Sequence, residues 1–437
     1  MSHFQGNGTR ASSLRGSFWL VLGFGGQKAI QLVSSLVLTR ILFPEAFGLM
    51  AIANVVVLAL AMFSDLGIRS SVVKSTRGDS PEFVNTAWTL KIIRGAVLWL
   101  ITCILAAPMA IFYGENILFP LICFLGFSAV IEGFGSISEF LEMRKLRLAR
   151  VIAVQFLSTF AGTAITIAFA YVYDTVWALA VGSIAASLIK TVLGYLVLPY
   201  HAHHFTIQKD SAREIIHFGR WILLATMVNF FSGHGLPLVQ GALVTIEVLG
   251  LITIARTLVM VFEELIQRII TNVGFSALSR IVREDREKLP AIVYRLRWAS
   301  NLAIIPVFLA LSVFGPYLVK LLYDERYTLA GTFLSILAVN SALRFLELLY
   351  QNTLLVLGDS RSHFYISLSM AVLRYGCMLA GYWATETVSG MLYGLCLGSA
   401  LAFLISLAYA IVNRYANVLA DIAGLLMIGI YLAVTIA

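Results

Sequence analysis

The chain has 437 residues, of which 59% are hydrophobic and only 12% are charged, and its mean hydropathy is +0.89. A soluble globular chain carries about a quarter charged residues, so this composition excludes a soluble fold and any enzyme that needs a large soluble catalytic domain. The net charge of +8 does not indicate nucleic acid as a partner, because excess Lys and Arg in a membrane protein reflects its orientation in the bilayer. We therefore expect an all-α polytopic membrane protein.

Apolar runs separated by charged or turn-rich breaks predict about twelve transmembrane helices, since roughly 20 residues cross a bilayer. They lie near residues 16–42, 48–66, 83–112, 117–141, 151–173, 177–199, 218–244, 248–275, 297–323, 330–357, 362–384 and 388–412. The tail after residue 417 is again apolar apart from Asp421. It is compatible with a thirteenth span, an interfacial helix or the first member of a further pair.

The basic residues predict the orientation of these spans. With the N-terminus in the cytoplasm, 22 of the 31 Lys and Arg residues fall on the cytoplasmic side, three on the other side and six within spans. This bias follows the positive-inside rule, and one missed or extra helix would scramble it. The group His201, His203 and His204 has no Cys or carboxylate at ligand spacing, so we expect a loop there and no metal site.

A weak internal repeat predicts two halves. Residues 45–54 read EAFGLMAIAN and residues 247–256 read EVLGLITIAR, and they match at five of ten positions. Each stretch covers the outer turn between the first two helices of its half, which is typical of transporters built from parallel repeats. We expect a six-helix lobe over residues 1–204, a second over residues 205–413 and an apolar tail over residues 414–437, with a substrate path between the lobes.

Several charged groups lie near the middle of the predicted spans, where each costs about 2.5–3.5 kcal/mol on insertion scales. They are Lys28, Glu132, Lys190, Arg256, Arg344, Glu347 and Arg374. Groups at this depth should face a cavity or one another, and their balance is positive. The sequence therefore predicts a cavity for an anionic substrate such as a phosphate, pyrophosphate or sugar acid. The candidate residues for binding the anionic head group are Lys28, Arg256, Arg344 and Arg374.

Other polar residues share faces with these charges. Asn340, Arg344, Glu347 and Gln351 follow spacings of 4, 3 and 4, which places them on one helix face. The candidate cavity or coupling groups are Gln27, Asp65, Glu132, Asn229 and Glu347, and Glu132 or Asp65 would carry a coupling proton or cation.

The alternative interpretation of each deep charge is an interhelical ion pair or hydrogen bond that only holds the bundle together. Arg344 with Glu347, and Glu264 with Arg268, are spaced to pair, whereas Lys28, Lys190 and Arg374 have no such predicted partner. Because the sequence has no Walker A motif, we expect no ATP hydrolysis and no cofactor. Coupling to H⁺, Na⁺ or the membrane potential stays open.

Residues 38–74 read LTRILFPEAFGLMAIANVVVLALAMFSDLGIRSSVVK. This stretch resembles the opening signature of the polysaccharide transporter family, within the multidrug/oligosaccharidyl-lipid/polysaccharide exporter superfamily. Members carry an LxRxLxPExFG turn and then an FSDLGL-like end of the second helix. The matching residues are Leu38, Arg40, Leu42, Pro44, Glu45, Phe47, Gly48, Phe63, Ser64, Asp65, Leu66 and Gly67. Residues 141–151 and 352–364 are similar to later connections of the family.

The resemblance implies a flippase of the Wzx type, with two six-helix lobes that open alternately to each face of the bacterial cytoplasmic membrane. Its substrate would be a polyprenyl-pyrophosphate-linked oligosaccharide for O-antigen, capsule or exopolysaccharide synthesis. Its partners would be membrane lipid and, as candidates, the polysaccharide polymerase and chain-length proteins, with no nucleic acid. The pyrophosphate would pair with Lys or Arg in the cavity.

Three other functions stay open. A cation-coupled multidrug exporter of the same superfamily would favour an acidic cavity. A membrane glycosyltransferase or polymerase would need a sizeable outer loop, and the predicted outer connectors are short. A noncatalytic assembly protein would not need the deep charges.

Overall fold

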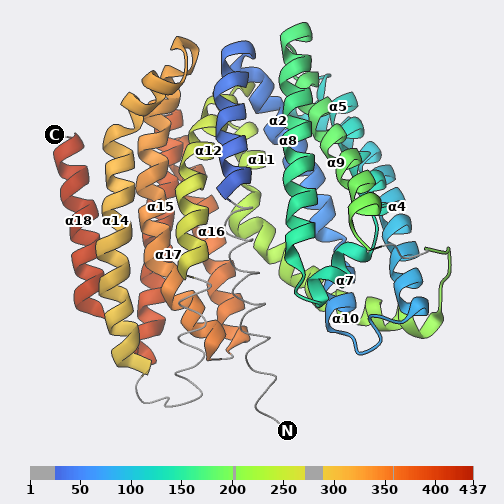
Figure 1. Ribbon diagram of the computed structural model, residues 1–437. Coiled ribbons are helices and arrows are strands. Elements are labelled where there is room, and N and C mark those ends of the chain that lie inside the picture. Colours follow the sequence, from blue (N-terminus) through green and yellow to red (C-terminus); the bar gives the residue numbers. More distant parts are fainter. Residues whose placement is uncertain (1–24, 200–202, 271–288, 358, 437) are drawn as a thin grey trace. The chain divides into compact units, whose positions relative to one another are not determined.

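The computed structural model describes residues 25–199, 203–270, 289–357 and 359–436, and every regular element in these ranges is a helix (Figure 1). Eight of the described helices are long and apolar enough to span a membrane, and the bent pair Leu118–Gly133 and Ser138–Arg144 adds a ninth if it counts as one span. The expected all-α polytopic membrane fold is therefore confirmed. The number twelve stays a prediction, because the predicted spans over 16–42 and 248–275 extend beyond the described residues.

The chain divides into two compact units. The first comprises Met1–Phe230 with Pro237–Ala242, and the second comprises Phe231–Leu236 with Leu243–Ala437. The two units are defined by the contacts within each of them, and not by the sequence repeat. The predicted lobe boundary after residue 204 therefore stays a prediction.

The first unit begins with a helix over residues 25–41. It continues through α2 (Pro44–Phe63), α3 (Ile68–Lys74), α4 (Pro81–Tyr113), α5 (Leu118–Gly126), α6 (Ser128–Gly133), α7 (Ser138–Arg144), α8 (Leu148–Tyr173), α9 (Trp177–Val197), α10 (Lys209–Asn229) and most of α11 (Leu236–Gly241). Pro44 and Pro81 occupy the first helical position of α2 and α4, where a missing N–H costs nothing. Gly67 takes a left-handed conformation, with φ of 60°, between α2 and α3.

Two predicted helices are broken in the structure. The segment predicted as one span over residues 117–141 forms α5, α6 and α7, with a bend of 63° between the α5–α6 part and α7. Lys91 Nζ donates to the Gly135 carbonyl oxygen at 2.9 Å, so the side chain satisfies a carbonyl in the break. The predicted span over 218–244 begins earlier, at Lys209, and α10 gives way to a π-helix, η1 (Phe230–His234), before α11.

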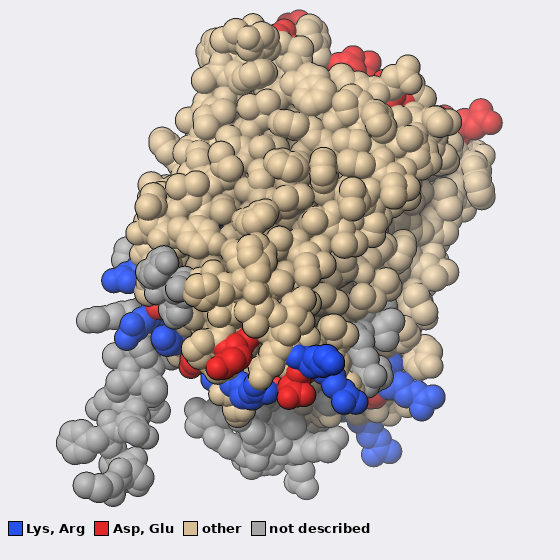
Figure 2. Space-filling view, turned by 90° about the vertical axis from the view of Figure 1, so that its right-hand side faces the viewer, with Lys and Arg blue, Asp and Glu red and all other residues tan. Residues whose placement is uncertain are grey.

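One end of the first unit is basic. The segments that lead into α4 and α8, together with the first turn of α8, carry Arg69, Lys74, Arg77, Arg144, Lys145, Arg147 and Arg150. Glu115 and Asp174 follow the opposite ends of these helices. Arg144 joins the two basic segments, because its Nε lies 3.3 Å from Asp79 Oδ2. On the face drawn in Figure 2, Lys and Arg gather at one end and a broad uncharged band separates them from acidic residues at the other.

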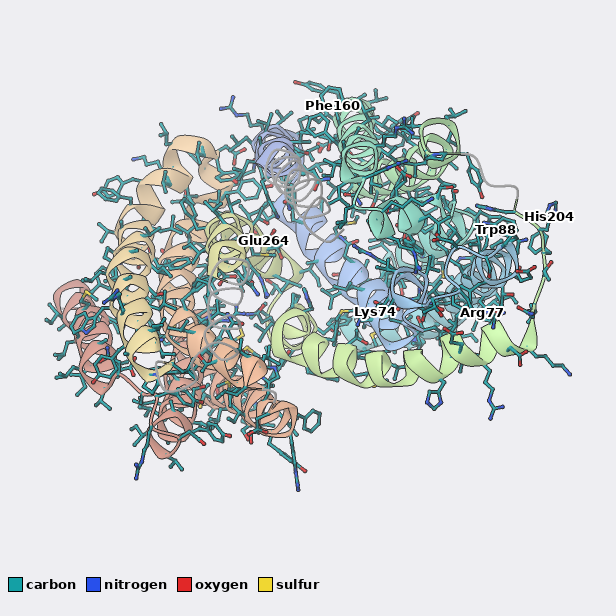
Figure 3. All side chains as sticks on the ribbon, turned by 60° about the horizontal axis from the view of Figure 1, so that its bottom comes forward. Lys74, Arg77, Trp88, Phe160, His204 and Glu264 are labelled. Atoms are coloured by element: carbon teal, nitrogen blue, oxygen red, sulfur yellow. The ribbon has the colours of Figure 1, made fainter. Side chains whose placement is uncertain are left out.

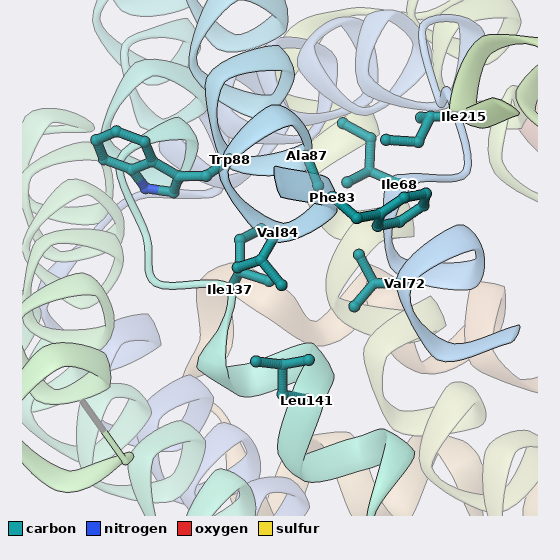
Figure 4. Packing of buried hydrophobic residues seen from close by; sticks show 9 residues of the cluster. All are labelled: Ile68, Val72, Phe83, Val84, Ala87, Trp88, Ile137, Leu141 and Ile215. Atoms are coloured by element: carbon teal, nitrogen blue, oxygen red, sulfur yellow. The ribbon is translucent and has the colours of Figure 1, made fainter. Parts of the chain in front are cut away.

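A buried apolar cluster lies at this basic end (Figure 4). It brings together side chains of α3, α4, α7, α10 and the residue before α7: Ile68, Val72, Phe83, Val84, Ala87, Trp88, Ile137, Leu141 and Ile215. His203 also packs here, with its ring 5.2 Å from that of Trp88 and its Nε2 3.1 Å from the Ser136 hydroxyl. The predicted loop histidine is thus a packing residue at the base of the unit.

The second unit contains α12 (Ile246–Ile269), α14 (Leu289–Leu322), η4 (Glu325–Tyr327), α15 (Thr328–Val356), α16 (Ser360–Thr385), α17 (Val388–Val412) and α18 (Val418–Ile436). The central helix is α15, which packs against the five other α-helices and is the most buried of the spanning helices. Asp359 caps α16, and hydrogen bonds from Ser362 and from the Tyr409 hydroxyl lower the pKa of Asp359 to about 2.

The C-terminal tail is part of the second unit. Helix α18 packs along α14 and α15, and its Asp421 forms a fully buried ion pair with Arg297 of α14. The Tyr350 hydroxyl also donates to Asp421, and Asn301 Nδ2 donates to the Ala420 carbonyl at 2.8 Å. In the sequence Asp421 stands out as the one charge of the tail after residue 417, and the structure gives it a buried partner on α14.

Candidate functional site

A cluster of charged side chains lies inside the second unit. Helix α12 supplies Arg256 and Glu263, helix α15 supplies Arg344 and Glu347, and helix α16 supplies Arg374. Helix α15 contacts both other helices, which brings residues far apart in the sequence into one region. Three guanidinium groups against two carboxylates leave an excess of one positive charge among these five groups.

The ion pairs of this cluster cross between helices. Arg344 Nη1 lies 3.4 Å from Glu263 Oε1, and Arg374 Nη2 pairs with Glu347 Oε1. The spacing of Arg344 and Glu347 had suggested that they pair with each other, and Arg374 had no predicted partner. Both interpretations were wrong, because each side chain reaches a neighbouring helix. Lys190 of the first unit likewise has a partner, since its Nζ lies 3.9 Å from Glu139 Oε2.

Arg256 binds to an irregular segment of backbone. Its Nη2 donates to the Gly233 carbonyl oxygen at 2.8 Å, and Gly233 lies in the π-helix η1. A π-helix displaces the normal hydrogen-bond pattern and is frequently found at functional sites. The arginine therefore fixes α12 to the irregular segment, and it also lies within electrostatic range of Glu263 and Arg344.

The arginines differ in accessibility. The Arg344 side chain is 32% exposed and that of its partner Glu263 is 18% exposed, whereas Arg374 and Glu347 are only 8% and 6% exposed. Arg344 is thus the better placed of the two for contact with a ligand, and the Arg374–Glu347 pair holds α15 against α16. Two other polar side chains of α15 have neighbours on different helices, because Ser399 donates to Asn340 at 2.7 Å and Gln351 lies 3.0 Å from the Met370 sulfur.

A second polar site is a cavity of about 220 Å³ in the first unit, beside the break between α6 and α7. Its charged lining consists of Arg69, Lys91, Arg94, Glu132, Glu139 and Lys190. Arg94 is committed to the end of α2, because its Nε donates to the Ser64 carbonyl at 2.7 Å. Lys91 and Arg94 were not among the predicted site residues, and α4 brings them to the cavity beside the break.

The remaining candidates lie in the first unit. Lys28 Nζ donates to Gln31 at 3.0 Å, on the helix that also carries Gln27. Asp65 accepts from the Gly67 N–H at 2.8 Å and so stabilises the turn between α2 and α3. Glu132 is exposed. Asn229 ends α10, and its side chain lies outside what the structure describes.

The sequence matches the model of a protein family described as polysaccharide biosynthesis protein over residues 37–331, about two thirds of the chain. The chain belongs to this polysaccharide biosynthesis family. The resemblance drawn from residues 38–74 is therefore confirmed. A similar curated protein is the lipopolysaccharide biosynthesis protein WzxC of Escherichia coli (strain K12), which is 24% identical over 77% of this chain and 68% of its own length.

Solved structures show the same fold for this family member. The lipid II flippase MurJ, in an inward closed conformation, has a TM-score of 0.73 at 9% identity and covers 94% of this chain and 91% of its own. An inward-facing multidrug resistance transporter of the MATE family, in the MOP superfamily, has a TM-score of 0.64 at 14% identity, with coverage of 93% and 95%. At such identities the likeness establishes the fold alone.

Proposed function

We propose that this family member moves a lipid-linked oligosaccharide across the bacterial cytoplasmic membrane, for synthesis of a surface polysaccharide. The observation that carries the proposal is the cluster of three arginines and two glutamates inside a membrane-embedded unit. A bilayer protein retains such groups where they serve a substrate or ion path. The name of the similar protein WzxC, with its role in lipopolysaccharide biosynthesis, supports a glycan as the cargo.

The polyprenyl pyrophosphate would bind at the accessible end of the cluster. The Arg344 side chain is held only loosely by Glu263, since the distance between Nη1 and Oε1 is 3.4 Å and about a third of the side chain is exposed. A guanidinium binds phosphate oxygens through two parallel hydrogen bonds, so the pyrophosphate would displace Glu263 from Arg344. Arg256 and Arg374 would not contact the pyrophosphate, but their positive charges within the cluster would add to the electrostatic attraction for it. The polyprenyl chain would stay in the bilayer while the unit opens to each face in turn.

Orientation and coupling belong to the same proposal. The basic end of the first unit would face the cytoplasm, with the N-terminus on that side. Glu132 is the candidate coupling carboxylate, because it is exposed and lies within electrostatic range of both Lys91 and Arg94. The driving force would be H⁺, Na⁺ or the membrane potential. A polymerase and chain-length proteins would take the glycan at the outer face.

Multidrug export is the other function found on this fold. The excess of positive charge in the cluster disfavours cationic drugs, because the like charge would repel them.

Deletion of the gene in its native host tests the proposal. The expected result is loss of surface polysaccharide, with lipid-linked oligosaccharide accumulating in the inner leaflet. Lys28→Ala and Arg344→Ala variants should fail to restore export although both reach the membrane. Normal export in the deletion strain, with greater sensitivity to cationic drugs, would instead establish the exporter.

A further inference from the structure

Helix α10 carries an open groove on the face that points away from the rest of the first unit. Six residues line it: Ile207, Lys209, Ala212, Arg213, Ile216 and His217, around a volume of about 510 Å³. The opposite face of the helix is buried, because Ser211 and Ile215 are both fully covered. Gly219 lies against the backbone of Leu66, where a Cβ would be only 2.3 Å from the carbonyl oxygen. The groove therefore stands on a firmly anchored helix.

The groove combines a basic row with an apolar row. Lys209, Arg213 and His217 follow one another at four-residue spacing, and Ala212 and Ile216 form the adjacent row. Among the described side chains no Asp or Glu lines it. Glu214 of the same helix is held elsewhere, because its Oε1 accepts from the Ser75 hydroxyl at 2.6 Å.

The apolar side chains beside the groove are exposed. Ile207 is 54% exposed, Ile216 is 50% exposed, and Phe205, which packs on Trp88, is 67% exposed. Ile216 lies on α10 itself, and Phe205 and Ile207 lie in the segment that leads into it; exposed apolar side chains beside basic ones are typical of a surface that lies at the membrane interface. Water is thus a poor environment for this surface, and an apolar partner with negative charge fits it.

Hydrogen bonds fix the groove at the level where the membrane spans begin. Gln208 N–H donates to Thr86 in the second turn of α4 at 3.1 Å, and Arg77 Nη2 donates to the Gln208 side chain at 3.1 Å. Figure 3 shows α10 beneath the first unit, with Arg77 close to its beginning and Lys74 further along. The surface therefore meets the head-group region of one leaflet, at the basic end of the unit.

We propose that this groove binds the phosphate head group of an anionic phospholipid, with Lys209 and Arg213 contacting the phosphate and Ile207 and Ile216 contacting the first acyl carbons. The site is separate from the arginine cluster of the second unit, and it does not depend on what the protein transports. Its role is to hold α10 at the bilayer surface.

Photocrosslinking of the full-length protein in nanodiscs tests this site. A benzophenone amino acid replaces Ile216, and the discs contain phosphatidylglycerol and phosphatidylcholine with identical acyl chains. We expect the adducts to favour phosphatidylglycerol, and Lys209→Gln with Arg213→Gln to lower that preference by about fivefold or more. The matched control is Lys145→Gln with Arg150→Gln, which removes the same charge from the same end and should leave the preference unchanged.

Equal crosslinking of the two lipids in the parent protein would overturn the proposal, as would an equal loss in the control. Adducts to a polypeptide, or to the polyprenyl-linked substrate in native membranes in place of phosphatidylglycerol, would also overturn it. The monodisperse elution of each variant from a sizing column shows whether the fold is kept. None of these readouts depends on transport, so failure here leaves the proposed function standing.

Discussion

The arginines of the second unit are committed to protein partners to different degrees. Arg374 is buried against Glu347 and Arg256 binds a backbone carbonyl, whereas Arg344 is a third exposed and only loosely paired. Depth along the predicted spans was enough to single out all three from the sequence. Their partners were not predictable, because helical spacing describes one helix and these contacts cross between helices. Glu263 was the clearest omission from the charge balance, although it lies near the middle of the predicted span over residues 248–275.

The Arg344 side chain gives the first prediction. Replacing it with Gln should weaken binding of a pyrophosphate-bearing lipid by about tenfold or more, because a charge-assisted bond to phosphate is lost. The affinity of Arg344→Lys for this lipid should lie between those of the parent protein and Arg344→Gln, since an ammonium keeps the charge and loses the bidentate geometry. Competition of inorganic pyrophosphate with a fluorescent lipid analogue measures this. The control is Arg326→Gln, which removes a cation held by Asp324 on η4. Equal losses in both variants would refute a specific role.

At the level of elements, the helices were well predicted where the apolar run was long and uninterrupted. The helices α8, α9, α15, α16 and α17 each begin and end within a few residues of the predicted spans. The broken segments were not predicted, because the backbone between α6 and α7 is held by side chains from other helices, such as Lys91. Tertiary contacts of this kind replace helical hydrogen bonds without changing the hydropathy of the segment, so hydropathy alone does not reveal the break.

The close packing of α16 on α17 gives a prediction with an internal control. A Cβ at Gly381 would lie 2.4 Å from the Gly390 carbonyl oxygen, whereas a Cβ at Gly376, on the same helix, would meet nothing within 4 Å. We expect Gly381→Ala to lower the thermal unfolding temperature in detergent. Gly376→Ala should leave it unchanged or raise it, because Ala favours a helix by about 1 kcal/mol over Gly. The opposite order of the two variants would contradict the packing.

The docking of α18 gives a second prediction at this level. Asp421→Asn leaves Arg297 buried without a carboxylate, which we expect to cost about 3–5 kcal/mol. Asp324→Asn breaks a partly exposed pair with Arg326 and should cost about 0–1 kcal/mol. Thermal unfolding of the two variants compares them, with limited proteolysis to detect release of α18. Similar stability of both variants would show that the tail is held by apolar contacts alone.

At the level of the whole molecule, composition and the motif at residues 38–74 were enough to predict the membrane class and the family. Both rest on many residues at once, so errors in single helices did not affect them. The cavity in the first unit could not be predicted, because it depends on the break between α6 and α7. The groove on α10 could not be predicted either, because it depends on where α10 folds back over α3 and α4. The basic residues that line the groove had been counted only as indicators of orientation.

The most direct test of the proposed function is a translocation assay in proteoliposomes. Purified protein is reconstituted with a polyprenyl-pyrophosphate-linked oligosaccharide, and a membrane-impermeant glycosidase reports the glycan on the outer leaflet over time. We predict that the parent protein and Arg326→Gln rapidly bring the glycan of the inner leaflet, which the glycosidase cannot reach at first, to the outer leaflet. Arg344→Gln should do so no faster than protein-free liposomes. If the parent protein gave the rate of protein-free liposomes with an ion gradient of either sign imposed, the proposed flippase activity would be contradicted.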